Sequence, residues 1–271
     1  MWALGAVVYW LGVHVMLGAL REARREPGLR QNWLNLLIAG LAIGSAVCAG
    51  TVVALTGNTM AFALGFGALM SAGLLVASWL GGLIGVLCLG LLPRWFGKLS
   101  GGLILGGMAT AVQIGWMVAA GFRPGLRWQP EAVGAAFAAG LAGALIALFM
   151  AFSAGAQFGS VRTRWRLAAS GLMAGTLVGS QELLIAGSRL GSQVGSVFQN
   201  ELPAPALSLV FGAVVPLLLV VAALDLGSGR RHRGDLPGAE ENISTLGAYP
   251  PGSSRSSSGK RRRRRHRIRN L

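Results

Sequence analysis

The sequence predicts an all-α, polytopic membrane protein with seven transmembrane helices. Three observations carry this prediction: the composition, the long apolar runs and the uneven placement of basic residues. Of the 271 residues, 53% are hydrophobic and only 12% are charged, about half the charged share of a soluble domain. The mean hydropathy is +0.59. Such a chain is expected to bury most of its length in a bilayer.

Seven apolar runs are each long enough to cross a bilayer, which takes about 20 residues. The predicted spans are residues 2–20, 33–55, 61–92, 99–120, 132–152, 167–187 and 204–226. The third run is longer than a span needs, which predicts a bend at Gly81-Gly82 or a tilted helix. Pro216 predicts a kink in the last span, because proline cannot donate a backbone hydrogen bond.

The basic residues set the predicted orientation. Of the 24 Lys and Arg residues, 21 lie in the first, third and fifth connections and in the tail, whereas the other connections hold only Arg123, Arg127 and Arg189. Because cytoplasmic connections carry the excess of Lys and Arg, the N-terminus is expected outside and the C-terminus in the cytoplasm.

The chain divides into a membrane domain, residues 1–226, and a tail, residues 227–271. The tail is rich in Gly, Ser, Pro and charge, a composition that predicts disorder. Each basic residue close to an anionic leaflet contributes about 1 kcal/mol, so we expect the tail to bind anionic lipid. No aromatic interleaving accompanies the basic block, which disfavours specific binding of nucleic acid. The predicted lipid-binding residues are Lys260, Arg261, Arg262, Arg263, Arg264, Arg265, Arg267 and Arg269.

An internal repeat relates the second, fourth and sixth spans. Each begins with Arg and Trp and continues with two glycines four residues apart. Interfacial Trp anchors a span, and paired small residues let helices approach closely. We therefore predict three two-helix repeats plus one further helix. The glycine pairs are Gly40 and Gly44, Gly102 and Gly106, and Gly171 and Gly175.

With these features the chain resembles the MHYT-domain family, bacterial seven-span membrane sensors built from three repeats. In that family the even spans end near the outer face in a Met-His-Tyr-Thr-type motif after a run of small residues. Here Gly40-Leu-Ala-Ile-Gly-Ser45 is similar to the first such run. The resemblance implies a sensor or signalling accessory in the bacterial inner (plasma) membrane that works with a separate signalling partner.

The family's histidines are replaced in this chain. Val47, Val112 and Gln181 stand at their positions. Copper or a diatomic gas has been suggested as the family's ligand, and that role rests on His and Met side chains, so we expect no metal or other cofactor. No P-loop, GxSxG or HExxH motif is found, and after Leu226 only the tail follows. We therefore expect no enzymatic activity.

The candidate ligand-binding residues are Gln113, Gln181 and Glu182. Glu182 is the only acidic residue well inside an apolar span, and intramembrane carboxylates usually face a protein interior or a water cavity. These three side chains are expected either to bind a small polar or cationic ligand or relay a proton, or to hold helices together. Two alternative functions stay open: a small permease whose path these residues line, and a structural membrane protein.

His14 is the only histidine within a span. With Met16 nearby, a metal contact is conceivable. A lone histidine without further ligands at suitable spacing more often makes a structural hydrogen bond, and we expect that role here.

Overall fold

The computed structural model describes residues 2–24, 29–57, 64–123, 126–153, 160–189, 195–198 and 200–234. This part of the chain is almost entirely helical, which confirms the predicted class. It contains α1 (Trp2–Ala23), α2 (Leu29–Gly57), α3 (Ala68–Leu91), α4 (Arg94–Ala119), α5 (Pro130–Ser153) and α6 (Ser160–Ala186). The seventh helical segment consists of α7 (Ala204–Leu209), the π-helical turn η1 (Val210–Val214) and α8 (Val215–Gly234).

Six helical segments in the described part are long and apolar enough to cross a membrane. They are α1 to α5 and the segment Ala204–Leu226, so a multi-pass membrane protein is supported. Helix α6 is not among the six. It begins with Arg162, Arg164 and Arg166 and carries Glu182 near its end, although it packs along α5 and α1 like the other helices.

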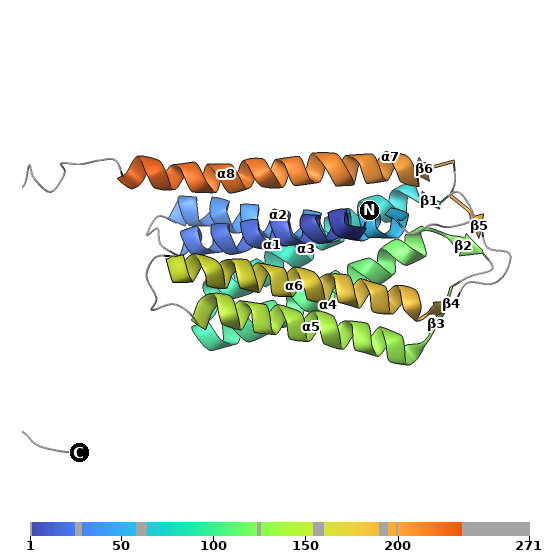
Figure 1. The fold of residues 1–271 in the computed structure, drawn as a ribbon, viewed down its shortest axis with the longest axis horizontal. Coiled ribbons are helices and arrows are strands. Elements are labelled where there is room, and N and C mark those ends of the chain that lie inside the picture. Colours follow the sequence, from blue (N-terminus) through green and yellow to red (C-terminus); the bar gives the residue numbers. More distant parts are fainter. Residues whose placement is uncertain are drawn as a thin grey trace, which may run out of the picture. The chain divides into compact units, whose positions relative to one another are not determined.

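The first six helices form a bundle in the compact unit Met1–Gly229. Each helix packs against the one that follows it, and α6 packs against α1, so the series closes on itself (Figure 1). Helix α4 also contacts α2 and α6. Helix α2 is the most enclosed, whereas the segment α7–η1–α8 packs mainly on α2 and exposes most of its side chains. The core therefore lies among α1, α2, α4 and α6.

The helix that forms the third predicted span is shorter than the apolar run, residues 61–92. Helix α3 begins at Ala68, and the residues before it form a two-residue strand, β1 (Gly65–Phe66). The helix continues through Gly81 and Gly82 without interruption, so the apolar run is shortened at its start and the helix is not broken at these glycines. A Cβ on Gly82 would lie 2.5 Å from the carbonyl oxygen of Gly40; glycine is needed here for close helix packing.

The last span changes its hydrogen-bond pattern just before Pro216. The five residues of η1 are π-helical, and the Val215 N–H bonds to the carbonyl of Val210. A π-turn widens the helix by one residue, and proline has no N–H to offer to the preceding turn. The predicted proline disturbance therefore takes the form of a π-turn. Helix α8 then continues to Gly234, and residues 235–271, with the basic block, lie outside the described residues.

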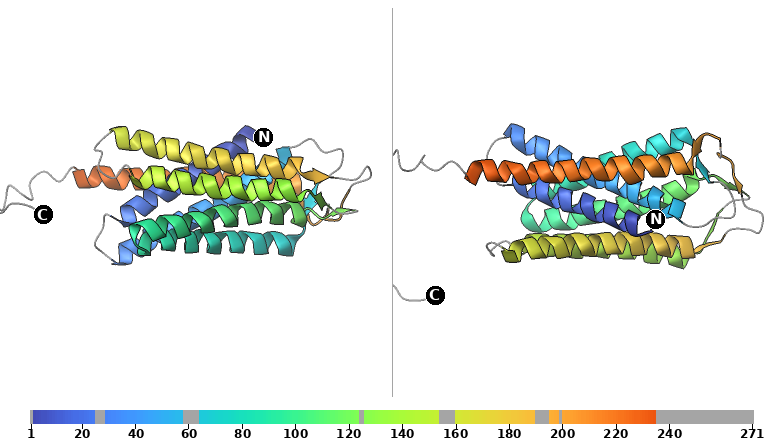
Figure 2. Two further views of the ribbon diagram at one scale, coloured as in Figure 1. Left: turned by 90° about the horizontal axis from the view of Figure 1, so that it is seen from below. Right: turned by 45° about the horizontal axis from the view of Figure 1, so that its top comes forward.

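Three short strand pairs lie at one end of the helices (Figures 1 and 2). The connection between α6 and α7 supplies one strand to each pair and so joins the other two connections at that end. The pairs are β1 with β6 (Leu202–Pro203), β2 (Phe122–Arg123) with β5 (Gly195–Ser196), and β3 (Arg127–Trp128) with β4 (Ser188–Arg189).

Ser196 lies at the middle of these strand pairs. Its Oγ is 2.8 Å from the carbonyl oxygen of Ala120 and 3.0 Å from that of Gly65, and it accepts from the N–H of Phe198 at 3.3 Å. Nearby, Glu201 Oε2 accepts from the N–H of Ala68 at 3.0 Å. A carboxylate at a helix N-terminus satisfies a backbone donor that has no partner within the helix. The α6–α7 connection thus holds the ends of α3 and α4 together.

Two of the three glycine pairs make the predicted close helix contacts. A Cβ on Gly44 would lie 2.7 Å from Ser78 O in α3, and one on Gly106 would lie 2.6 Å from Gly140 O in α5. In contrast, a Cβ on Gly171 or Gly175 would meet no heavy atom of a neighbouring element within 4 Å in the described part of the chain. The prediction that this third pair forms a helix seam is therefore wrong.

We predict opposite effects for Gly106→Ala and Gly175→Ala. The first places a methyl group against the backbone of α5 and should lower the free energy of unfolding by about 1–3 kcal/mol. The second adds a better helix former in open space and should be neutral or stabilising by up to about 1 kcal/mol. Thermal unfolding in detergent, followed by tryptophan fluorescence, measures both. Equal losses in the two variants would contradict the assignment of the seams.

We also predict that Ser196→Ala loosens the strand-paired end. The backbone groups that share its hydroxyl would lose a buried partner, at a cost of about 1–3 kcal/mol. Limited proteolysis should then cut the connection between α6 and α7 faster than in the wild type. Ser208→Ala is the matched control, because the Ser208 hydroxyl is exposed and bonds to Pro205 O within its own helix. Unchanged cleavage in Ser196→Ala would contradict the prediction.

Candidate functional site

The centre of the bundle is organised around Tyr9, a fully buried residue of α1. Its hydroxyl reaches side chains of three other helices. The oxygen lies 2.9 Å from Thr51 Oγ1 in α2, accepts from Gln113 Nε2 in α4 at 3.2 Å, and donates to Gln181 Oε1 in α6 at 3.0 Å. We refer to these four residues as the Tyr9 centre.

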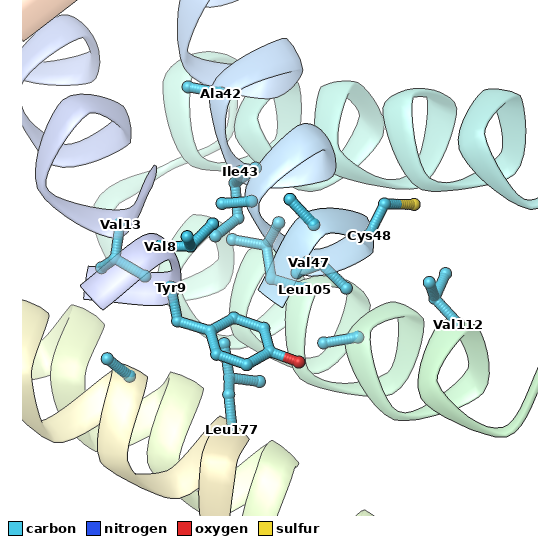
Figure 3. Packing of buried hydrophobic residues seen from close by; sticks show 14 of the residues in the cluster. Val8, Tyr9, Val13, Ala42, Ile43, Val47, Cys48, Leu105, Val112 and Leu177 are labelled. Atoms are coloured by element: carbon cyan, nitrogen blue, oxygen red, sulfur yellow. The ribbon is translucent and has the colours of Figure 1, made fainter. Parts of the chain in front are cut away.

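Apolar side chains enclose the aromatic ring of Tyr9. Figure 3 shows the ring extending from α1 into the bundle, with Val47, Leu105 and Leu177 around it. On the α2 side the ring lies directly against the backbone, because a Cβ on Gly50 would be 2.8 Å from two ring carbons. Glycine at this position therefore makes room for the phenol.

The two glutamine amides each have one possible orientation. Gln113 Nε2 also donates to Leu177 O at 2.9 Å, and its Oε1 accepts from Ser180 Oγ at 3.0 Å. Gln181 Nε2 donates to Thr51 O at 3.0 Å. A backbone carbonyl can only accept, so reversing either amide would set two acceptors against each other. Both amides are thus committed to bonds between helices.

The network is neutral and closed on itself. Thr51 Oγ1 donates to Val47 O at 2.7 Å, and Thr110 Oγ1 lies 3.5 Å from Ser180 Oγ. All of these polar side chains are buried and none of them is ionised. Because an unmet polar group costs more in an apolar interior than in water, a network in which each of these polar atoms has a partner favours a single arrangement of the helices that contribute to it.

The polar residues of the Tyr9 centre occupy equivalent positions in α2, α4 and α6. Thr51 and Gln113 each follow the second glycine of a packed pair, Gly44 or Gly106, by seven residues. Helix α6 shows the same burial pattern as α4, which places Gln181 opposite Gln113. Between residues 101 and 116 of α4 the buried positions are 101, 102, 105, 106, 109, 110, 112, 113 and 116, and between residues 169 and 184 of α6 they are 169, 170, 173, 174, 177, 178, 180, 181 and 184.

This register differs from the one expected from the motif. The counterparts of the packed glycines Gly102 and Gly106 in α6 are Ser170 and Ala174, one position before the predicted Gly171 and Gly175. Gln181 then corresponds to Gln113 and Thr51, not to Val112 and Val47. Both valines are buried apolar residues of the core.

The structure brings two of the three predicted ligand-binding residues together. Gln113 and Gln181 bond to the same hydroxyl, and both are almost fully buried. Glu182 is the next residue along α6 and is half-buried, and the hydrogen bonds of the Tyr9 centre involve Gln181 instead. The sequence analysis did not identify Tyr9, because a single tyrosine in an apolar run is typical of an interfacial residue. The available signal was its hydroxyl group, which needs a hydrogen-bond partner when it is buried.

A second polar contact joins α1 to α6 through His14. Arg166 Nη2 lies 2.8 Å from His14 Nε2, Ser170 Oγ lies 3.5 Å from His14 Nδ1, and Trp10 stacks on the imidazole at 5.5 Å between ring centroids. A guanidinium can only donate, so His14 Nε2 accepts and the ring proton is on Nδ1. His14 thus makes the expected structural hydrogen bond. No group of three potential metal ligands forms among the residues that the structure describes.

Comparisons with known proteins do not identify the chain. No family model matches it. No curated protein matches it, and no solved structure does. The geometry of the Tyr9 centre and the sequence are therefore the observations that bear on its function.

We predict that Tyr9→Phe and Gln181→Leu each destabilise the protein and that their effects are coupled. Hydrogen bonds between helices in membranes contribute about 0.6–1.7 kcal/mol each, and the Tyr9 hydroxyl donates one to Gln181 and accepts one from Gln113, so Tyr9→Phe should cost about 1–3 kcal/mol. The double variant should lose less than the sum of the two single losses, by about 0.5–3 kcal/mol.

Thermal unfolding of the wild type, the two single variants and the double variant in one detergent measures this coupling. Thr56→Val is the control, because the Thr56 hydroxyl bonds to Val52 O and Val53 O in its own helix and should not couple to Tyr9. Additive losses for Tyr9→Phe and Gln181→Leu would contradict a shared network.

Proposed function

We propose that this chain is an integral membrane sensor or signalling accessory without catalytic activity, in which α1 carries the signal. The observation that carries the proposal is the Tyr9 hydroxyl, which links α1 to α2, α4 and α6 at one point. If α1 moves away from this point, the Tyr9 hydroxyl separates from its partners on all three helices. The position of α1 is therefore coupled to the packing of the whole bundle.

The contact between α1 and α6 differs in kind from the α2–α3 and α4–α5 contacts. Helices α2 and α3 meet backbone to backbone at Gly44, and α4 and α5 do so at Gly106. Between α1 and α6, polar side chains meet instead: Tyr9 with Gln181, and His14 with Arg166. Polar side chains can exchange partners, whereas interlocked backbones have to separate. This favours the α1–α6 contact as the one that rearranges.

The placement in the membrane follows from charge and aromatic residues. We propose seven spans with the N-terminus outside and the C-terminus in the cytoplasm, in a bacterial inner membrane. Trp33, Trp95 and Trp165 are exposed near the starts of α2, α4 and α6, where an interfacial belt requires them. The basic tail would add contact with anionic lipids, and a separate protein would receive the signal.

The resemblance to MHYT-domain proteins supports the sensor class through the repeat. Thr51, Gln113 and Gln181 lie at equivalent positions of three helices, as a three-repeat membrane domain requires. The substitution of the motif histidines by Val47, Val112 and Gln181 argues for a ligand other than a metal.

A permease has less support. Transport would require polar groups that are available to a substrate along a path. The side-chain amides of Gln113 and Gln181 instead form hydrogen bonds with Tyr9 and with backbone carbonyls of α6 and α2. Glu182, the third residue expected to line such a path, is not one of the four residues of the Tyr9 centre.

Hydrogen exchange in lipid nanodiscs tests the proposal. Wild type and Gln181→Leu would be compared with and without metal ions, small amines, alcohols and phenols. For a sensor, at least one compound changes exchange in α1 and α6 of the wild type and has no effect in Gln181→Leu. Glu182→Gln is the control and should respond like the wild type, because Glu182 lies outside the Tyr9 centre. No compound-dependent change in the wild type would leave a structural membrane protein as the better description.

A further inference from the structure

We infer that Thr51, Gln113 and Gln181 form a binding site for a neutral phenol, or a similar small hydroxylated aromatic compound, and that Tyr9 occupies this site as an internal ligand. The inference rests on the proposed function and deepens it, because it assigns a ligand class to the Tyr9 centre. The site belongs to α2, α4 and α6, whereas its occupant belongs to α1.

The polar groups of the site define the chemistry of its ligand. Gln181 Oε1 requires a donor, and Gln113 Nε2 requires an acceptor at almost the same point. A hydroxyl group supplies both. A ketone can only accept, and an ammonium group can only donate. Because no charged side chain takes part in the Tyr9 centre, the ligand is neutral.

The walls of the site define the rest of the ligand. Val47, Leu105 and Leu177 surround the ring of Tyr9 (Figure 3), and the α2 backbone at Gly50 lies directly against the ring. This slot is narrow and apolar, which suits a flat aromatic ring. Apolar cavities of this kind remain dry and take up small aromatic molecules when their natural occupant is removed.

Occupation by Tyr9 makes ligand binding competitive with the docking of α1. An external phenol can bond to Gln113 and Gln181 only if the Tyr9 ring leaves. Tyr9 and His14 both bond to α6, so the release of the ring also weakens the attachment of α1 to α6. The site is therefore autoinhibited by α1, and its ligand acts by displacing that helix.

Chemical rescue of Tyr9→Ala tests the inference. The variant empties the slot and keeps Thr51, Gln113 and Gln181 in place. We expect p-cresol to restore most of the melting temperature that the variant loses, in a saturable manner, since a ligand that binds the native state stabilises it. Toluene, which has the same ring without the hydroxyl, should restore much less, because a site built for a hydroxyl rejects an analogue that lacks it.

Two further variants serve as controls. Tyr9→Phe keeps the slot filled and should show no rescue by p-cresol. The double variant Tyr9→Ala with Gln181→Leu should lose the preference for p-cresol over toluene. If Tyr9→Ala does not accumulate in membranes, its yield during expression with p-cresol or with toluene in the medium becomes the readout, with the same expected order.

Equal rescue by toluene and p-cresol, or no rescue by either, would overturn the inference. Neither result affects the hydrogen-exchange test of the proposed function, which uses the intact Tyr9. Conversely, rescue by p-cresol together with an unresponsive wild type would establish the site and remove the signalling role.

Discussion

The fold depends on one constraint: the hydroxyl of Tyr9 has to meet three partners from three helices at one buried point. An amide buried without its partners costs about 1–3 kcal/mol, and Gln113 and Gln181 meet this requirement only when α1, α2, α4 and α6 are at matching depths. Glycine seams permit close approach of helices in lipid, but they specify axial position only through shape. The Tyr9 centre adds the directional bonds that choose one register.

The combination of close packing and directional hydrogen bonds explains how α6 is retained in the bundle. Helix α6 is the least apolar of the helices α1 to α6, and the face that carries Gly171 and Gly175 makes no close contact in the described chain. It is held on one side by α5, where a Cβ on Gly143 would lie 1.9 Å from Thr176 Oγ1. On the other side it is held by polar bonds to α1. The helix that lipid alone would favour least is thus secured by packing and hydrogen bonds.

The same polar bonds give the bundle a contact that can rearrange. A seam of interlocked glycines separates only with the loss of many contacts, whereas Tyr9 and His14 can exchange partners within α1 and α6. Stabilisation and signalling therefore share the same residues in our proposal. This agrees with the general finding that polar groups inside membrane domains concentrate at functional positions.

The sequence by itself determined the membrane class, the approximate helix positions and two of the four residues of the Tyr9 centre, because hydropathy and polar residues in apolar runs are local signals. It placed the third small-residue pair one position too late, at Gly171 and Gly175 instead of Ser170 and Ala174. One residue rotates a helix position by about 100°, and only packing shows which face meets a neighbour. The role of Tyr9 was likewise decided by tertiary structure, since its partners are 42, 104 and 172 residues away along the chain.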